Sequence, residues 1–310
     1  MEQGRAARCF APDAELPPLI DKKESMVRHP AVAGSFYKGS PEGLKKQVEG
    51  FIVPAAQRRK AFGILSPHAG LVYSGPVAGA VYSSVELPDT FVLIGPNHTG
   101  LGAPLSLMAK GVWETPLGVV ELDEALANAI AAKSPRIRED SLAHLREHSI
   151  EVQLPFIQHF KKHFKIVPIQ MLDTRLETCL ELGRAVAAAI QERRGEEAEC
   201  GGGHGDNSAL RTPGVLIVAS SDMSHYERAA AAKEKDYRAI HKIENLDPEG
   251  LYRTVKDYGI TMCGYGPAIA MLAACKSLGA SRAELIRYAN SGEVSGDYEQ
   301  VVGYAGIIVM

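Results

Sequence analysis

The sequence predicts a single α/β domain with a central, mostly parallel or mixed sheet flanked by helices. Short apolar runs alternate along most of the chain with longer segments of helix-forming residues, which is the pattern of repeated β–α units. Two of these runs, 61–65 and 90–95, are bounded by Pro/Gly turns, as expected for strands buried on both faces. With 310 residues, of which 45% are hydrophobic, the chain can bury a large core.

The first half of the chain predicts two helices and a hairpin after these strands. Residues 76–85 are rich in small side chains and predict a helix packed closely on the sheet. The stretch 103–122 alternates apolar runs with turn residues and holds the only tryptophan, Trp113, so a β-hairpin is expected there. A helix is predicted at 123–133, with Asp123 as its N-cap.

The second half continues the alternation to the C-terminus. Residues 149–164 predict a helix that is interrupted or restarts at Pro155, because proline lacks the backbone N–H. The cleanest amphipathic helix covers 175–194. The other predicted elements are strands at 165–172, 214–220, 283–290 and 300–310 and helices at 229–243, 248–258 and 266–279. This continuous alternation predicts one domain rather than two.

Two segments break the pattern. Residues 1–25 contain no apolar stretch long enough for a signal peptide, and we expect a disordered leader there. Residues 196–214 are rich in Gly and polar side chains and lack periodicity, which predicts a flexible insertion in a surface loop. The predicted domain therefore covers 26–310.

Charge and cysteine usage exclude several classes of protein. The 34 Lys and Arg against 37 Asp and Glu leave a net charge of −3, which offers no field for nucleic acid or anionic lipid. The five cysteines are irregularly spaced and do not form a disulfide framework, so a reducing cytoplasm is expected. No apolar run approaches the length of a membrane span. We therefore expect neither a nucleic-acid partner nor a membrane.

Two histidines each follow an apolar strand inside a tight turn. The run FGILSPHAG carries His68, and the run FVLIGPNHTG carries His98. A strand that ends in such a turn holds its next side chain at the carboxyl edge of the sheet, where α/β proteins keep their active sites. Metal-binding imidazoles favour fixed positions of this kind. The pair therefore predicts metal ligands, and the structural alternative is that each satisfies a buried polar contact.

A third strand end, in GVLIVASSDMSHY, carries Asp222 and His225. These residues are three apart and share one face if a helical turn begins here. A carboxylate beside an imidazole orients it, as a general acid or base requires. We predict a catalytic role for His225, oriented by Asp222. The alternative is a helix cap at Asp222 and a surface histidine.

Cys263 lies in the Gly-rich turn DYGITMCGYGPAIA, between two predicted helices. Neighbouring backbone N–H groups and the charge of a metal would both favour its thiolate. A free cysteine is most often a small apolar core residue, but the flanking glycines argue for function here. We predict that Cys263 joins His68 and His98 as a metal ligand.

The stretch HLREHSIE contains the inverted zincin motif H-x-x-E-H. In that motif His144 and His148 would bind zinc, and Glu147 would activate water. Pro155 limits the helix that would carry it. A zinc metalloprotease is therefore a minor alternative. Another is that His148 or Glu151 faces the main site as a supporting group.

Several motifs taken together resemble the Memo family, known in bacteria and archaea as protein B of the AmmeMemoRadiSam system. They are AVAGSFY, SPHAGLVYSG, GPNHTG, EHSIEVQLPF, SSDMSHY and the cysteine turn, and they occur in the family's order from about Val27 to the C-terminus. The resemblance implies a fold similar to class III extradiol dioxygenases, which are non-haem iron enzymes that open catechol rings. It also implies iron or copper at His68, His98 and Cys263, with the acid/base pair beside the metal.

The same resemblance implies partners and carries one departure. The partners are a radical SAM enzyme and a small third component of the system, whereas the animal relatives are known as adaptors for phosphotyrosine peptides. Extradiol enzymes use two histidines and a carboxylate, and this chain offers Cys263 in the carboxylate's place. A thiolate is softer and shifts the preference toward copper(I), zinc or a thiolate-bound iron.

Two hypotheses from different classes remain open from the sequence. The first is a cytoplasmic metalloprotein that uses iron or copper, with zinc as the alternative metal, for redox or oxygen chemistry on a small aromatic substrate. The second is a non-catalytic module that binds a peptide or partner protein in the same pocket. Whether the protein is an enzyme is undecided at this level.

Overall fold

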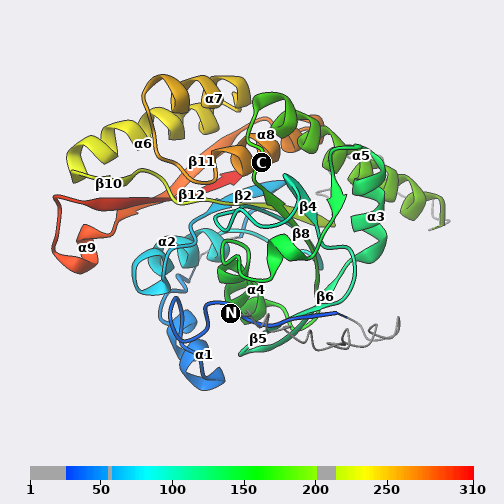
Figure 1. The fold of residues 1–310 in the computed structure, drawn as a ribbon, viewed down its shortest axis with the longest axis horizontal. Helices are drawn as coiled ribbons and strands as arrows, with labels where there is room; N and C mark the ends of the chain where they lie inside the picture. Colours follow the sequence, from blue (N-terminus) through cyan, green and yellow to red (C-terminus); the bar gives the residue numbers. More distant parts are fainter. Residues whose placement is uncertain (1–25, 55–57, 201–213) are drawn as a thin grey trace, which may run out of the picture.

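A computed structural model describes residues 26–54, 58–200 and 214–310. It confirms the predicted fold class, with one mixed sheet and helices on both of its faces (Figure 1). The predicted leader, 1–25, lies outside the described residues. Within the described ranges, no helix is both long and apolar enough to cross a membrane.

The centre of the sheet is a block of five parallel strands. In spatial order these are β6 (Gly118–Leu122), β8 (Lys165–Met171), β3 (Thr90–Pro96), β9 (Val215–Ser220) and β2 (Gly63–Ser66). β3, β9 and β2 are buried along their whole length, which explains why their sequences are continuous apolar runs rather than alternating ones. The predicted parallel core is thus confirmed.

Antiparallel strands extend this block on both sides. β12 (Val301–Val309) pairs with β2, β11 (Ala283–Asn290) and β10 (His225–Glu227). On the other side, β5 (Val112–Thr115) forms a hairpin with β6 and also pairs with β1 (Val27–Arg28). β4 (Leu105–Leu107) pairs with β8 and with β7 (Arg138–Glu139). The predicted hairpin is therefore confirmed only for its second part.

Two layers of helices bury the two faces of the sheet (Figure 1). One layer contains α3 (Glu124–Ala132), α5 (Leu176–Cys200), α6 (Ala229–Glu244), α7 (Pro248–Asp257) and α8 (Tyr265–Ser277), and the other contains α1 (Pro41–Glu49), α2 (Leu71–Ser83) and α4 (Leu154–Phe160). A short helix, α9 (Gly292–Ser295), joins β11 to β12.

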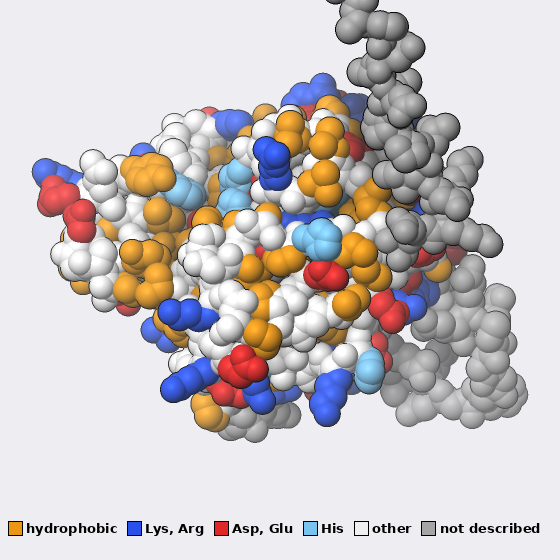
Figure 2. Space-filling view, turned by 60° about the horizontal axis from the view of Figure 1, so that its bottom comes forward, with side chains coloured by type: hydrophobic (Ala, Val, Ile, Leu, Met, Phe, Trp, Pro, Cys, Tyr) orange, Lys and Arg blue, Asp and Glu red, His pale blue; other side chains and the backbone are white. Residues whose placement is uncertain are grey.

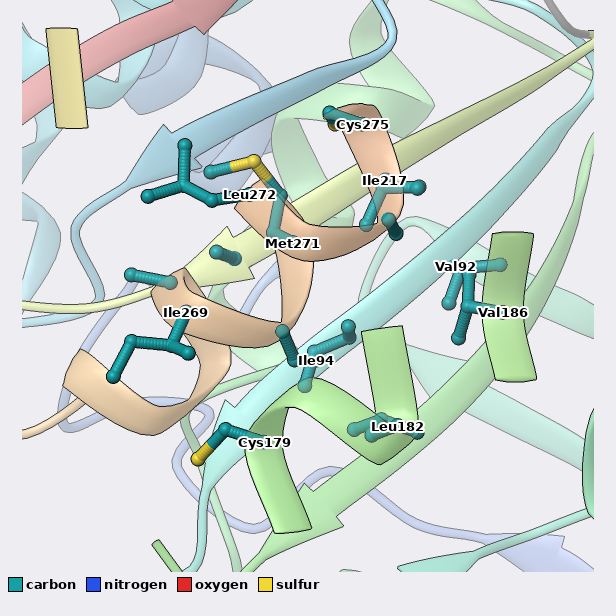
Figure 3. Close-up of a cluster of buried hydrophobic side chains, with 14 of the residues drawn as sticks. Val92, Ile94, Cys179, Leu182, Val186, Ile217, Ile269, Met271, Leu272 and Cys275 are labelled. Carbon is teal, nitrogen blue, oxygen red and sulfur yellow. The ribbon is translucent and has the colours of Figure 1, made fainter. Parts of the chain in front are cut away.

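Successive side chains of β3 point alternately into the two hydrophobic cores, one on each face of the sheet. Val92 and Ile94 lie in the first core, where Figure 3 shows Val92 beside Val186 of α5. Phe91 and Leu93 point to the opposite face and pack in the second core. This is the period of two expected for side chains on a strand. Because both faces are covered, the functional chemistry is confined to the edges of the sheet.

Two predicted helix boundaries change. α2 begins at Leu71 rather than 76, so that Pro76 lies inside the helix; burial of most of this helix outweighs the cost of an internal proline. α5 continues to Cys200, so residues 196–200 are helical and not part of the predicted loop. The remainder of that loop, apart from Gly214, lies outside the described residues. Asp123 caps α3 as predicted, accepting a hydrogen bond from Leu126 N.

A fully buried ion pair fastens the N-terminal segment to the domain. Arg28 and Glu151 are both 0% exposed and form a direct ion pair. The Glu151 carboxylate also accepts hydrogen bonds from the backbone N–H groups of Ala31 (2.7 Å) and Val32 (3.1 Å) and from the Tyr37 hydroxyl. Every charge removed from water here is therefore paired.

Replacing Glu151→Ala should destabilise the fold strongly, because it leaves the Arg28 guanidinium buried without its counter-charge. We expect a loss of about 3–5 kcal/mol in the free energy of unfolding, measured by urea denaturation. The control is Glu284→Ala, which removes the partner of Arg59 from a pair in which Glu284 is 51% exposed; its loss should stay below about 1 kcal/mol. Equal losses in the two variants would contradict this role of the buried pair.

Candidate metal centre

The carboxyl ends of three neighbouring parallel strands form the floor of the site. β9 lies between β3 and β2, and the pairing aligns Ser220 with Ser66 and Ala219 with Ile94. His68, His98 and Asp222 each follow the last residue of one of these strands by two positions. Because the strands are parallel and in register, the three turns lie at the same edge of the sheet.

Cys263 reaches this edge from the loop between α7 and α8. The next residue, Gly264, donates its backbone N–H to the Ser221 hydroxyl at 2.9 Å. A Cβ atom at Gly264 would lie 2.3 Å from the Ser220 carbonyl oxygen, so only glycine allows so close an approach. This contact presses the cysteine turn against the end of β9.

The structure brings the three predicted metal ligands together. Sγ of Cys263 lies 3.3 Å from Nε2 of His68, and the ring centroids of His68 and His98 are 5.3 Å apart. One donor atom from each of the three residues lies within 4.8 Å of the others. Metal–nitrogen bonds of about 2.1 Å and metal–sulfur bonds of about 2.3 Å would separate N and S by roughly 3.6 Å in tetrahedral geometry. The donor set therefore fits one transition-metal ion.

A chain of buried hydrogen bonds fixes the tautomer of His68. The Ser220 hydroxyl donates to the Ser149 carbonyl at 2.6 Å, and Gln153 Nε2 donates to Ser220 Oγ at 2.8 Å and to the Pro67 carbonyl at 3.0 Å. Since the single hydroxyl proton is used, Nδ1 of His68, 2.9 Å from Ser220 Oγ, must be the donor. The lone pair of Nε2 is then directed at the site.

The Glu147 carboxylate fixes the tautomer of His98. Its buried carboxylate accepts from the Nδ1 atom of His98 at 3.0 Å, and from the backbone N–H groups of His98, His148 and Ser149. An ionised carboxylate only accepts, so Nδ1 of His98 carries the proton and Nε2 is free to bind a metal. Glu147 is fully engaged by these contacts and acts as a positioning residue.

The protonation states suit metal binding. Burial, followed by His148 and His98, holds the pKa of His68 well below its ordinary value, so the imidazole is neutral as a ligand must be. Burial and the nearby Asp222 carboxylate raise the pKa of the Cys263 thiol. The neighbouring backbone N–H groups are therefore insufficient by themselves to form the thiolate. A bound cation must supply the stabilisation that displaces this proton.

Asp222 and His225 are not arranged as predicted. Asp222 Oδ1 accepts from the backbone N–H groups of His68 at 2.8 Å and Ala69 at 3.2 Å, so it shapes the His68 turn. His225 begins strand β10 rather than a helical turn, and its Nδ1 donates to the Thr261 carbonyl at 2.9 Å. The residue that orients His225 is therefore Thr261. In the neutral ring, Nε2 of His225 remains the proton acceptor.

The H-x-x-E-H stretch does not form a zincin site. It begins in the 3₁₀ turn η1 (Leu142–His144) and continues without an α-helix. His144 is fully buried with its ring 5.8 Å from that of Trp113. It belongs to neither candidate donor group of the described residues, which are His68 with His98 and Cys263, and His98 with Glu147 and His148. The zinc-protease alternative is therefore wrong.

His148, in contrast, faces the main site. Its ring stacks on that of His98 at 4.8 Å and lies 5.5 Å from that of His68. Glu151, the other residue considered for a supporting role, belongs to the Arg28 pair described above. Sequence reasoning missed Glu147, Ser220 and Gln153 as positioning residues. The only signal was that polar side chains stand beside the predicted ligands.

Fold and site together define an α/β protein with a candidate two-histidine, one-cysteine metal centre at the carboxyl edge of its sheet. The family described as Memo-like protein matches residues 28–308, and the chain belongs to this family. The recognition made from the motifs is thereby confirmed.

Similar proteins extend over nearly the whole chain. A MEMO1 family protein of Methanothermobacter thermautotrophicus is 42% identical, covering 90% of this chain and 99% of the relative. A MEMO1 family protein of Aquifex aeolicus is 43% identical, with 92% and 99% covered. A crystal structure of an uncharacterised Escherichia coli K12 protein superposes with a TM-score of 0.50 at 11% identity, over 79% of this chain and 98% of the other. That similarity concerns the fold alone.

The Glu147 carboxylate should make stability pH-dependent. Burial opposes its ionisation, but the bonds from His98 and the backbone hold the pKa of Glu147 at about 2, against 4.5 in a free side chain. A lowered pKa stabilises the fold above pH 4.5 and loses this contribution as pH falls toward 2. Near pH 7 the free energy of unfolding of the metal-free protein should therefore exceed that of the Glu147→Gln variant by about 3 kcal/mol. Urea unfolding should show this difference shrinking between pH 5 and pH 2. A gap that is constant with pH would contradict this.

Removing the acceptor of His68 Nδ1 should weaken metal binding without removing a ligand. For Ser220→Ala we expect the affinity for Fe(II) to fall by about 10- to 100-fold, measured anaerobically by chelator competition. Ser66→Ala is the matched control, since Ser66 is paired with Ser220 across β2 and β9 and its buried hydroxyl has no hydrogen-bond partner among the described residues. Affinities that fall equally in both variants would remove the tautomer argument.

Proposed function

We propose that this Memo family protein holds one iron or copper ion between His68, His98 and Cys263 and uses it for redox or oxygen chemistry on a small aromatic substrate. The observation that supports this most directly is the convergence of the three donors from three separate segments, with the Nδ1 atom of each histidine held by a neighbouring side chain and the Nε2 atom of His68 only 3.3 Å from the Cys263 sulfur. Structural contacts alone would not require that both rings expose the same nitrogen to one point.

The chemistry of the donors supports a redox metal. Two imidazoles and a thiolate suit iron, copper and zinc, and the electron-donating sulfur favours copper(I) or a thiolate-bound iron. When bound, such an ion supplies electron transfer and an electrophilic position for an anionic ligand. The protein's part would be to hold such an ion through His68, His98 and Cys263.

His225 and His148 are the candidates for proton transfer beside the three proposed ligands. His225 is held by the Thr261 carbonyl and the Thr261 hydroxyl, which accepts its backbone N–H at 2.7 Å, so its Nε2 can take a proton from a phenolic hydroxyl. Burial raises the pKa of the Asp222 carboxyl, and nearby His225 opposes this rise. His148 lies against both ligand rings and borders the same space.

The second candidate function is a binding module that uses this pocket without turnover. It is favoured by exposed apolar side chains on the turns that follow the site residues, namely Tyr73, Leu101 and Tyr226. Recognition of a partner, including the radical SAM enzyme and the third component of the system, belongs to this candidate. Both functions need the same pocket, and metal content separates them.

Metal analysis of protein purified without oxygen tests the proposal. We expect close to one iron or copper per chain in the unmodified protein, and loss of that metal in His68→Ala and Cys263→Ala. Cys275→Ala is the matched control, because Cys275 is a buried cysteine near the C-terminal end of α8 and belongs to neither candidate donor group of the described residues. Its variant should retain the metal even if it is less stable.

A consistently metal-free protein, or full metal occupancy in both site variants, would refute the metal centre. The first of these results would favour the binding module. The second would place the metal elsewhere in the molecule.

A further inference from the structure

A strained tyrosine stands beside the candidate centre. Tyr226 directly follows His225, has a backbone φ of +59°, and is 75% exposed. This is the left-handed region, which glycine enters freely and a bulky side chain enters only with strain. The rings of His225 and Tyr226 are 5.9 Å apart.

A β-bulge produces this conformation. In the pairing of β10 with β12, His225 opposes Val302 and Glu227 opposes Val301, so Tyr226 is the extra residue. Bulges whose first residue is left-handed ordinarily carry glycine at that position, and bulges next to active sites re-aim a side chain. The bulge therefore presents the Tyr226 ring to solvent next to the acid/base candidate.

Packing does not compensate for the strain at Tyr226. Leu246 is the other non-glycine residue with positive φ in the described chain, at +52°, but it is only 8% exposed and lies in the main hydrophobic core. Burial of its side chain offsets the strain there. The largely exposed Tyr226 gains little from folding. A strained, exposed residue beside a functional site is the situation in which a ligand contact is expected.

A second partly exposed tyrosine follows one of the candidate metal ligands in the sequence. Tyr73 lies in the first turn of α2, five residues after His68, and is 38% exposed. Burial raises the pKa of the Tyr304 hydroxyl, and nearby Asp222, Tyr73 and Tyr226 raise it further. Figure 2 shows a face of the molecule on which histidine side chains lie among hydrophobic ones.

We propose that Tyr226 is a specificity-determining residue that stacks on the aromatic ring of the ligand as that ring approaches His225. The inference rests on the proposed function, which already supplies a phenolic ligand, and adds the residue that selects its ring. Offset or edge-to-face packing of two rings provides the attraction. The ring belongs to a small phenol or to a tyrosyl side chain, and the two are distinguished by experiment.

The test compares Tyr226→Gly with Tyr226→Phe, using 4-nitrocatechol and N-acetyl-tyrosinamide as separate probes and both metal-free and Fe(II)-loaded protein. Glycine relieves the strain, so its Tm should stay equal or rise, while the dissociation constant for the preferred probe should increase by about 3- to 10-fold. Phenylalanine keeps the ring and should bind within about twofold of the unmodified protein. Metal content should be the same in all three.

Several results would overturn the inference. They are a glycine variant that binds both probes as well as the unmodified protein, a clear fall in its Tm, or no saturable binding of either probe to the unmodified protein. Failure of the metal proposal is seen separately. If the protein holds no metal but its binding of the probe still depends on Tyr226, the metal proposal fails and ring recognition by Tyr226 stands. If the protein holds the metal but its binding of the probe does not depend on Tyr226, only the inference about Tyr226 fails.

Discussion

The parallel, in-register alignment of β3, β9 and β2 is the constraint on which the site depends. Each strand is buried on both faces, so its polar chemistry can emerge only where the strand ends. Alignment of the three ends brings His68 and His98 to one place, although 30 residues of sequence separate them. The cysteine turn is then held against the middle strand by the glycine contact at Gly264. A shift of one residue in β9 would break this arrangement.

Buried hydrogen bonds fix which ring nitrogen of each histidine carries the proton. Nδ1 of His68 donates to the Ser220 hydroxyl, whose own proton is already used in the bond to the Ser149 carbonyl. Nδ1 of His98 donates to the Glu147 carboxylate, which has no proton to give. The same contacts orient both rings, and burial holds the pKa of His68 well below its ordinary value. Cys263 differs, because burial and Asp222 disfavour its thiolate. Binding through all three donors therefore requires a cation that displaces the thiol proton, whereas binding through the histidines alone does not.

Much of this could be predicted from sequence, and the failures have physical reasons. Buried strands and their Pro/Gly turns are local signals, so the strand ends carrying His68 and His98 were identified. Strand order depends on tertiary packing, so the convergence itself was only a hypothesis. The spacing of Asp222 and His225 fits a helix equally well, and the bulged strand that forms instead is fixed by pairing with β12. Glu147 was assigned to a zinc motif from the spacing H-x-x-E-H alone. That motif needs a helix to bring its histidines to one face, and the structure has no α-helix there.

X-ray absorption spectroscopy of the protein loaded anaerobically with Fe(II) tests the central claim most directly, because it reports the atoms bound to the ion. The account predicts one sulfur neighbour at about 2.3 Å together with nitrogen neighbours near 2.0–2.1 Å, and loss of the sulfur contribution in Cys263→Ala. A spectrum with only nitrogen and oxygen neighbours in the unmodified protein would contradict it, since the ion would then lie away from the cysteine turn.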